Sequence, residues 1–414
     1  MRVRIHRGTK EIGGNCIELE SQGQRLVLDL GMPLSVADPN KVALPEIPGL
    51  ANGESPDFLG VLISHPHQDH FGLLSKAHPS TPVFIGREAH ALLKAAAAFS
   101  PSGLHIKNAI YYRDRHPRDI GPFRITPFLN DHSAFDAYSF LIEAEGKALF
   151  YTGDFRAHGR KPRAFERLLS QGPRGVDALL MEGTNLGRQG NGAEPDTERQ
   201  LEEYIRGSLA RTRGLALAWF SGQNIDRFVT FFRGAKLAGR TFVVDVYTAH
   251  LLDALGRTSL PSPRGPDLRV FLPQRMRSKI VRDQNFDLVK PYYRRRIYPE
   301  ELRAKASTLV MTFRPTMCQD LEKAGCLKGG RLIYSLWPGY LERGSNDIRA
   351  WCRTHGVDFD IQHVSGHAGL ADMKRLVEAL SPRRVVPIHS LATDSFSDHF
   401  PNVQQANDGE WWDV

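Results

Sequence analysis

Short apolar runs separated by turn-forming residues fill the first 186 positions of the chain. Residues 25–30 (RLVLDL) and 59–64 (LGVLIS) are examples, and Gly, Pro, Asn or Asp bounds most of these runs, as is typical of strands. Helical spacing is clearest at residues 88–99 and 163–170. This part therefore predicts stacked sheets with some covering helices. Further strands are predicted at residues 1–8, 81–85, 123–128, 138–143, 148–152 and 178–181.

A polar, turn-rich segment at residues 187–197 (GRQGNGAEPDT) marks a domain boundary. Beyond it, strand and helix alternate, which predicts an open parallel sheet. The helices are expected at residues 198–211 and 224–238, and the strands at 215–220, 241–246, 307–312 and 331–336. A helix at 370–380, a strand at 384–388 and a closing strand within 409–414 complete the pattern. We expect a first domain of residues 1–186 and 361–414, interrupted by a second of residues 187–360.

Composition narrows the class of protein. With 414 residues, 41% hydrophobic and 24% charged, the chain is too long for a disulfide scaffold and too apolar for disorder. Its formal charge of +8 suits a polyanionic partner, although many globular proteins carry such an excess on a solvated surface. The four cysteines show no CxxC pairing, and no run is apolar enough for a signal or membrane segment. A cytoplasmic protein without membrane attachment is expected.

The densest chemical signal is SHPHQDH at residues 64–70, directly after an apolar run. His65, His67, Asp69 and His70 then lie at a strand terminus and point into one small volume, as a metal site requires. A single histidine is usually a surface or core residue, but three with an aspartate within six positions are not explained by structure alone. The segment predicts a metal centre.

Three more candidate ligands end strands in the same way. His132 follows residues 123–129, Asp154 follows 148–152, and His389 follows 384–388. Each begins a turn at the end of an apolar run. An aspartate after Thr-Gly also occurs as an ordinary turn former, so Asp154 alone would carry little weight.

Taken together, these motifs resemble a known family. HxHxDH, with LDLG at Asp29, DHS at His132 and TGDF at Asp154, resembles the metallo-β-lactamase fold. Glu182, His367 and His389 resemble motifs A, B and C of the β-CASP nucleases. EIGGN (11–15), FSGQNIDR (220–227) and HVSGHA (363–368) are similar to the ribonuclease J family in particular. The resemblance implies an α/β fold: an αββα metallo-β-lactamase sandwich with an inserted α/β β-CASP domain.

The resemblance also implies a dinuclear zinc centre, with Mn²⁺ as the substitute metal. One ion would be held by His65, His67 and His132, the second by Asp69, His70 and His389, and Asp154 would bridge both. Such a pair activates a hydroxide at neutral pH for in-line attack on a phosphodiester. With Asp69, the catalytic residues would include His367, which protonates the leaving oxygen, and Glu182, which orients His367 unless it is a surface carboxylate.

Other residues receive supporting roles from the same resemblance. Asp29 would stabilise the metal loop from behind the ligands. Ser221 and Asn224, together with Ser365 and Gly366, would bind a terminal phosphate, although Ser221 or Asn224 is equally suited to capping the following helix. A histidine at motif C favours RNA over DNA as the substrate.

An arginine-rich stretch at residues 264–303 also bears on the substrate. Arginine for phosphates and aromatic rings for bases is the mixture that binds single strands, although a solvated basic surface over a buried aromatic core fits the pattern too. The stretch includes Arg275, Arg277, Lys279, Arg282 and residues 294–296, with Phe271, Phe286, Tyr292, Tyr293 and Tyr298 interleaved.

We therefore expect a zinc-dependent ribonuclease that hydrolyses single-stranded RNA with a metal-bound hydroxide, by exonucleolytic or endonucleolytic attack. The alternatives are a β-CASP DNA nuclease, a small-molecule ester, lactam or thioester hydrolase of the same fold, and an RNA-binding module without activity. The chain ends soon after motif C, so the extra C-terminal domain of ribonuclease J is expected to be missing, and a homodimer is left open.

Overall fold

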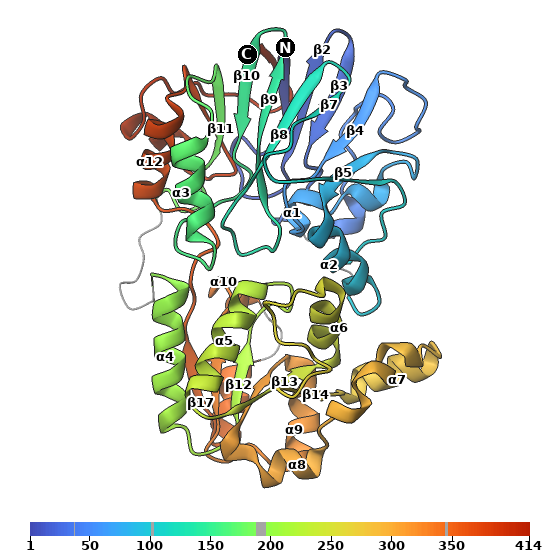
Figure 1. The fold of residues 1–414 in the computed structure, drawn as a ribbon, viewed down its shortest axis with the longest axis vertical. Coiled ribbons are helices and arrows are strands. Elements are labelled where there is room, and N and C mark those ends of the chain that lie inside the picture. The colour runs from blue at the N-terminus through green and yellow to red at the C-terminus, as the bar shows by residue number, and fades with distance from the viewer. Residues whose placement is uncertain (37, 101–102, 188–195, 344–346) are drawn as a thin grey trace. The chain divides into compact units, whose positions relative to one another are not determined.

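The computed structural model describes residues 1–36, 38–100, 103–187, 196–343 and 347–414. The chain folds into two compact units, Met1–Gln189 with Gly366–Val414 and Gly190–Ser365 (Figure 1). The α/β fold class is confirmed. The boundaries predicted at residues 187 and 361 stay predictions. None of the described helices is long and apolar enough to cross a membrane.

The first unit contains two sheets that pack face to face. One has the strand order β19-β1-β2-β3-β4-β5-β6 and the other the order β18-β11-β10-β9-β8-β7. Apolar side chains from both sheets, such as Leu19 and Leu26 from one and Phe140 and Leu180 from the other, form a shared core. The strands are β1 (Arg2–Arg7), β2 (Cys16–Ser21), β3 (Gln24–Leu28), β4 (Phe58–Leu62), β5 (Val83–Gly86), β6 (Ala109–Tyr112), β7 (Arg118–Ile120), β8 (Phe123–Leu129), β9 (Tyr138–Ala144), β10 (Lys147–Tyr151), β11 (Ala178–Glu182), β18 (Val385–Ile388) and β19 (Trp411–Asp413).

Helices cover the outer faces of both sheets. On the first sheet, Ala89 and Leu93 of α2 (Arg87–Ala97) pack with Val61 and Val83. On the second, α3 (Pro162–Gln171) and α12 (Leu370–Leu380) pack together, and their apolar faces share one cluster with Phe150. The helix α1 (Gln68–Phe71) is a single turn after β4. The layers are therefore helix, sheet, sheet, helix, as predicted.

Three neighbouring strands of the second sheet run parallel and end at the same edge. Strand β11 lies between β10 and β18, and Glu182 at its end is in register with Ile388. Asp154 follows β10, and His389 follows β18. Because carboxyl ends of parallel strands meet at one edge, residues more than 200 positions apart become neighbours there.

The second unit is built on a parallel sheet with the strand order β14-β13-β15-β12-β16-β17. This confirms the predicted open parallel sheet. The strands are β12 (Ala216–Trp219), β13 (Thr241–Asp245), β14 (Leu268–Phe271), β15 (Leu309–Thr312), β16 (Arg331–Tyr334) and β17 (Asp358–Ile361). Its α-helices are α4 (Glu198–Arg211), α5 (Ile225–Leu237), α6 (Val246–Leu255), α7 (Gln274–Arg282), α8 (Pro299–Ala304), α9 (Cys318–Ala324), α10 (Gly339–Arg343) and α11 (Ile348–His355) among the described residues.

Local sequence explains where several of these helices begin. Thr197 and Gln200 form a reciprocal capping box at the start of α4, which begins at the predicted residue. The apolar pattern predicts that Val246 ends a strand, but the side chain of Asp245 accepts a hydrogen bond from the Thr248 amide, and α6 begins at Val246. Asp245, as a helix-capping residue, is the sequence signal for this helix start, and the apolar pattern alone does not reveal it.

A buried ion pair joins α4 to α5 inside this unit. Arg227 and Glu198 are both fully buried, with Nη2 of the arginine 3.0 Å from Oε1 of the glutamate. Nε also donates to Glu198, while Nη1 and Nη2 donate to the carbonyl oxygens of Ser335 and Val364. The pair thus fixes two helices to two loops of the same unit.

Candidate metal centre

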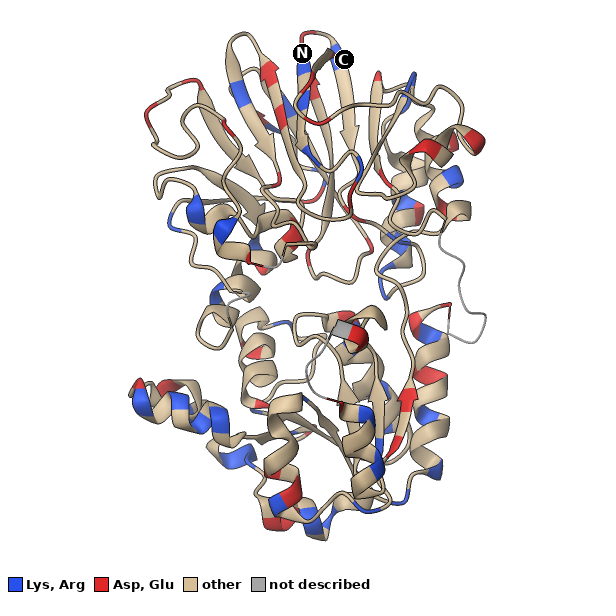
Figure 2. Cartoon of the chain, turned by 180° about the vertical axis from the view of Figure 1, so that it is seen from behind, with Lys and Arg blue, Asp and Glu red and all other residues tan. Residues whose placement is uncertain are grey.

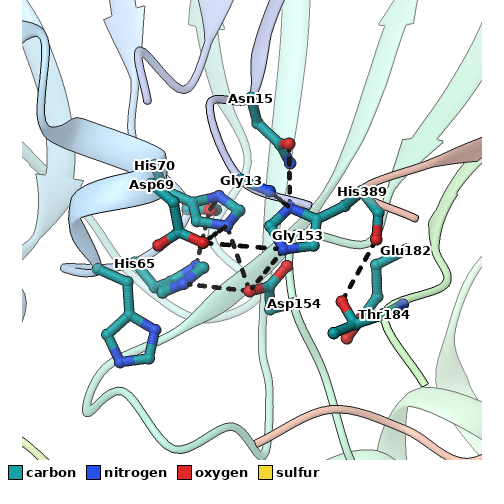
Figure 3. A network of polar contacts seen from close by, with 12 residues as sticks. Gly13, Asn15, His65, Asp69, His70, Gly153, Asp154, Glu182, Thr184 and His389 are labelled. Carbon is teal, nitrogen blue, oxygen red and sulfur yellow. Dashed lines mark hydrogen bonds and ion pairs between the residues drawn. The ribbon is translucent and has the colours of Figure 1, made fainter. Parts of the chain in front are cut away.

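The strand ends of the first unit bring the predicted ligands together (Figure 3). Two groups of four residues each have potential ligand atoms within 4.8 Å of one another, and both groups include Asp154. A third group of three joins Asp154 to Glu182 and His367. The two groups of four are His65, His67, His132 and Asp154, and Asp69, His70, His389 and Asp154.

Asp154 lies at the centre of this cluster. Its Oδ2 atom is 3.5 Å from Nε2 of His65 and 3.2 Å from Nε2 of His70. The corresponding Nε2 atoms of His132 and His389 are 3.8 and 3.9 Å away. Asp154 is buried, and neither of its carboxylate oxygens accepts a hydrogen bond from the part of the chain that the structure describes, so it is not a turn former.

The far side of each buried imidazole is held by the protein. Nδ1 of His132 lies 2.5 Å from the carbonyl oxygen of Gly366, which can only accept, so this nitrogen carries the proton. Nδ1 of His70 lies 2.7 Å from the carboxylate of Asp29. For His389 the partner is Oδ1 of Asn15 at 3.0 Å, a shorter contact than the 3.4 Å from the Gly13 amide. This bonding leaves the Nε2 lone pairs directed at the cluster, which is the usual arrangement behind metal-bound histidines.

The unsatisfied atoms of the cluster fit a metal. Among the described residues, the Nε2 atoms of His65, His70 and His389 and both oxygens of Asp154 are buried without a hydrogen-bond partner. Leaving such groups unpaired is costly, and several of them converge on one point. Imidazole and carboxylate are ligands that zinc and related divalent ions accept. The chemistry of the donor set therefore fits divalent ions.

Asp29 binds the cluster from behind. Its buried carboxylate accepts hydrogen bonds from the amide and the hydroxyl of Ser64, both at 2.7 Å, and from the hydroxyl of Tyr151 at 2.6 Å. With the His70 contact, this makes four bonds to one side chain. Asp29 and His389 also have left-handed backbones, with φ of 56° and 50°, a conformation that non-glycine residues adopt at a cost and that often occurs at functional sites.

Glu182 and His367 form a separate pair beside the cluster. Both carboxylate oxygens of Glu182 lie 3.1 Å from Nδ1 of His367. Glu182 is buried and also accepts the amide hydrogens of Phe155 and Thr184, so it is not a surface carboxylate. The imidazole of His367 is 3.7 Å from Asp154 and its side chain is 21% exposed, which leaves it accessible to a bound molecule.

Burial and charge divide the protonation states of these groups. Burial lowers the pKa of His65 and His132 well below its usual range and that of His67 to about 4, which favours the neutral, metal-binding form. Burial by itself would raise the pKa of Asp154. The surrounding imidazoles have the larger effect and hold this pKa well below its usual range, so the carboxylate stays ionised. For His367, burial is outweighed by the carboxylates of Glu182 and Asp154, which raise its pKa to about 9.

The four predicted phosphate contacts are distributed over both units. Asn224 caps α5, since its side chain accepts the amide hydrogen of Arg227, and Ser221 is exposed in the loop before it. Both belong to the second unit, as does Ser365. Gly366 begins the second part of the first unit, where its carbonyl holds His132. Their role toward a phosphate stays a prediction.

Sequence reasoning missed the residues that orient the ligands. Asn15 holds His389, while Ser64 and Tyr151 bind Asp29. Asn15 lies in the EIGGN motif, so a signal was present, but its partner lies 374 positions away. Ser64 precedes His65 directly and could have been found as a polar residue at the strand end.

Two family matches lie mostly in the first unit. Residues 34–194 match the β-lactamase superfamily domain, and residues 359–402 match the Zn-dependent metallo-hydrolase RNA specificity domain. The second match includes His367 and His389.

Curated relatives extend the similarity over most of the chain. The ribonuclease J of Sinorhizobium meliloti is 24% identical over 89% of this chain and 65% of its own length. The corresponding values are 26%, 94% and 68% for ribonuclease J of Mycobacterium tuberculosis, and 22%, 92% and 55% for that of Helicobacter pylori. The chain thus spans about half to two thirds of the length of these relatives.

A solved structure shows the same fold. It is the crystal structure of a protein of unknown function from Enterococcus faecalis V583, with a TM-score of 0.78 at 19% identity, and the match covers 99% of both chains. The family matches, the similarity to ribonuclease J and the His and Asp cluster agree with one another. The chain thus contains a β-lactamase superfamily domain and an RNA specificity domain of Zn-dependent metallo-hydrolases, and over most of its length it is similar to ribonuclease J.

Proposed function

We propose that this protein is a ribonuclease that uses two Zn²⁺ ions, or Mn²⁺ in their place, to hydrolyse phosphodiester bonds of single-stranded RNA. The observation that carries the proposal is the position of Asp154, shared by two groups of four ligand residues whose Nε2 atoms converge on its carboxylate. A carboxylate between two sets of imidazoles is what a dinuclear site needs.

Each group of ligands would hold one ion. His65, His67 and His132 would bind the first, Asp69, His70 and His389 the second, and Asp154 both. When bound, the ions lower the pKa of a coordinated water and withdraw charge from the phosphodiester oxygens. Burial favours the neutral form of His65, His67, His132 and His389. Asp29, Asn15 and the Gly366 carbonyl fix the orientation of His70, His389 and His132.

His367 would supply the proton for the leaving oxygen. Its carboxylate partner Glu182 stabilises the protonated imidazole, and a pKa of about 9 keeps most of the side chain charged at neutral pH. A charged imidazole at the edge of the metal cluster can donate a proton to an alkoxide as it leaves. Glu182 itself is fixed by two backbone amides and so acts as a positioning residue.

The choice of RNA is supported by the second family match, whose RNA specificity domain includes His367 and His389. Ribonuclease J relatives from several bacteria support the same substrate class. We further propose a cytoplasmic location, in keeping with four cysteines that are all unpaired. A homodimer remains a proposal from the sequence resemblance.

Labelled single-stranded RNA, a DNA strand of the same sequence and a generic thioester, each with Zn²⁺ or Mn²⁺, test the proposal directly. We expect cleavage of RNA by the native protein and none by the Asp154→Asn variant. Asp119→Asn is the matched control, because Asp119 is 71% exposed and lies in the strand β7, outside the cluster. Equal cleavage by the Asp154 variant, or turnover of the thioester alone, would refute a ribonuclease.

A further inference from the structure

A strongly basic segment of the second unit lies outside the metal centre. It consists of α7, the short turns Phe286–Leu288 and Lys290–Arg295, and the residues that follow to Tyr298, and we name it the basic arm (residues 274–298). It contains eight Lys or Arg and two Asp, a formal charge of +6, against +8 for the whole chain. Figure 2 shows Lys and Arg closely spaced along α7. The arm thus carries most of the excess charge of the protein.

Part of this charge is not neutralised by the protein. Among the residues that the structure describes, Arg275, Arg277 and Lys290 are exposed and make no ion pair. Lys279 and Arg282 both contact one aspartate, Asp283, at 2.7 and 3.0 Å. Cations without a counter-ion repel one another, so an anionic partner would gain energy by binding here.

Aromatic rings are exposed among these cations. Phe286, Tyr293 and Tyr298 are 57, 62 and 49% exposed, although large apolar side chains are usually buried in a core. Arg294 donates a hydrogen bond to the hydroxyl of Tyr293 at 2.7 Å, and the guanidinium of Arg296 lies 4.9 Å from the ring centre of Tyr298. The rings are thereby held at the surface beside positive charge.

Other side chains of the segment are buried and anchor it. Tyr292 and Ile297 are almost fully buried, as is Ile280 on α7, and Phe271 of the preceding strand lies in the core. The sequence pattern groups Phe271 and Tyr292 with the nucleic-acid-binding rings, but both face inward. The structure therefore separates the aromatic residues into an anchoring set and an exposed set.

We propose that the basic arm is a binding surface for single-stranded RNA, separate from the metal centre. It would hold a part of the RNA strand that is not being cleaved. Arginine and lysine would bind backbone phosphates, and Phe286, Tyr293 and Tyr298 would stack on unpaired bases. Exposed rings distinguish a single strand from a duplex, whose bases are already stacked. The arm lies outside both family matches, so neither of them accounts for it.

The choice of RNA as the polyanion rests on the proposed function, so binding is measured without cleavage. The probe is a fluorescent single-stranded RNA, and its anisotropy is followed with metal-free protein in EDTA over a series of salt concentrations. The charge variant is Arg275→Ala with Arg277→Ala and Lys290→Ala. Its matched control removes three exposed arginines elsewhere, Arg199→Ala with Arg353→Ala and Arg383→Ala.

The charge variant should bind RNA about 10- to 100-fold more weakly. Its slope of log K against log salt should be less steep by about 2, since a single strand contributes about 0.7 for each neutralised phosphate. The control should keep the native slope and affinity to within about twofold. Equal losses in both triple variants would overturn the arm, because only net charge would then matter.

A ring variant separates stacking from charge. Phe286→Ala with Tyr293→Ala should weaken binding by about fivefold or more per ring with no change in salt slope, and Tyr293→Phe should retain native affinity. If the ring variant binds RNA with the affinity of the native protein, the stacking surface is overturned. Tighter binding of duplex RNA, or of vesicles containing phosphatidylserine, than of the single strand would overturn the choice of partner.

Cleavage of a dinucleotide distinguishes this inference from the proposed function. A dinucleotide has a single phosphodiester, which must lie at the metal centre to be cleaved, so the charge variant should cleave it at the native rate. RNA binding through the arm by a protein that cleaves no RNA would refute the proposed function alone. Native binding by an active charge variant would refute the arm alone.

Discussion

Replacing Asp29 by asparagine should weaken one metal site without disturbing the backbone. Asparagine has the same shape as aspartate and tolerates the left-handed φ of 56° found here. The Asp29→Asn change therefore removes only a charge and an acceptor from a side chain that receives four hydrogen bonds of 2.6 to 2.7 Å.

The magnitude follows from the donors around Asp29. The hydroxyls of Ser64 and Tyr151 can rotate to accept from an amide, but the backbone N–H of Ser64 and Nδ1–H of His70 contact different carboxylate oxygens and can only donate. Whichever way the introduced side-chain amide is turned, its NH₂ group therefore faces an N–H donor, either the Ser64 amide or Nδ1–H of His70. The orientation that keeps the Ser64 bond forces His70 to move its proton to Nε2, the atom that faces Asp154.

Losing one charged, buried hydrogen bond should lower the free energy of unfolding by about 1.5 to 3 kcal/mol. Affinity for the ion at Asp69, His70 and His389 should fall by about 10- to 100-fold, the usual effect of removing a residue that supports a metal-binding histidine. Affinity at His65, His67 and His132 should change much less.

The assay is a Zn²⁺ titration in competition with a chromophoric chelator, which resolves two binding steps. Asp136→Asn is the matched control: Asp136 is buried, also has a left-handed φ, of 62°, and accepts backbone amides of α2 rather than a metal ligand. It should leave both steps unchanged. Two native steps in the Asp29 variant, to within about threefold, would refute this reasoning.

Three further outcomes are expected. His367→Ala should lower the single-turnover rate of RNA cleavage by about 10²- to 10⁴-fold while Zn²⁺ stoichiometry is unchanged, and loss of metal would show that His367 acts as a ligand instead. Arg227→Met removes the positive charge beside the buried Glu198, so urea unfolding should report a loss of about 3 to 5 kcal/mol in the free energy of unfolding. Adding Glu198→Gln should largely restore it, and no loss in the single variant would contradict the ion pair. Burial and the neighbouring Glu88 carboxylate raise the pKa of Asp136 to about 6. Between about pH 4 and 6 the folded state therefore holds a proton on Asp136 that the unfolded state has lost. The contribution of this group to the free energy of unfolding should fall as the pH rises from about 4 to 6. Urea unfolding at several pH values should show that fall in the native protein and not in Asp136→Asn.

The amino-acid sequence by itself predicted the elements and the candidate ligands. Strands and helices depend on local periodicity and capping, as at α4 and α12, whose bounds match the predicted ones. The ligands were found because His65, Asp154 and His389 each follow an apolar run, and a residue at a strand end is positioned by a few neighbouring residues. The periodicity and the strand ends are readable without knowing which strands pair.

Only the tertiary structure decided how the ligands are oriented. Which nitrogen of His132 faces Asp154 depends on the carbonyl of Gly366, 234 positions away, and His389 depends in the same way on Asn15. Asn15 precedes β2 in one sheet and His389 follows β18 in the other, so their contact requires the two sheets to pack together, which no local pattern specifies. Hydrogen bonds between distant residues exist only after the sheets have formed, and they set the tautomers on which metal binding relies.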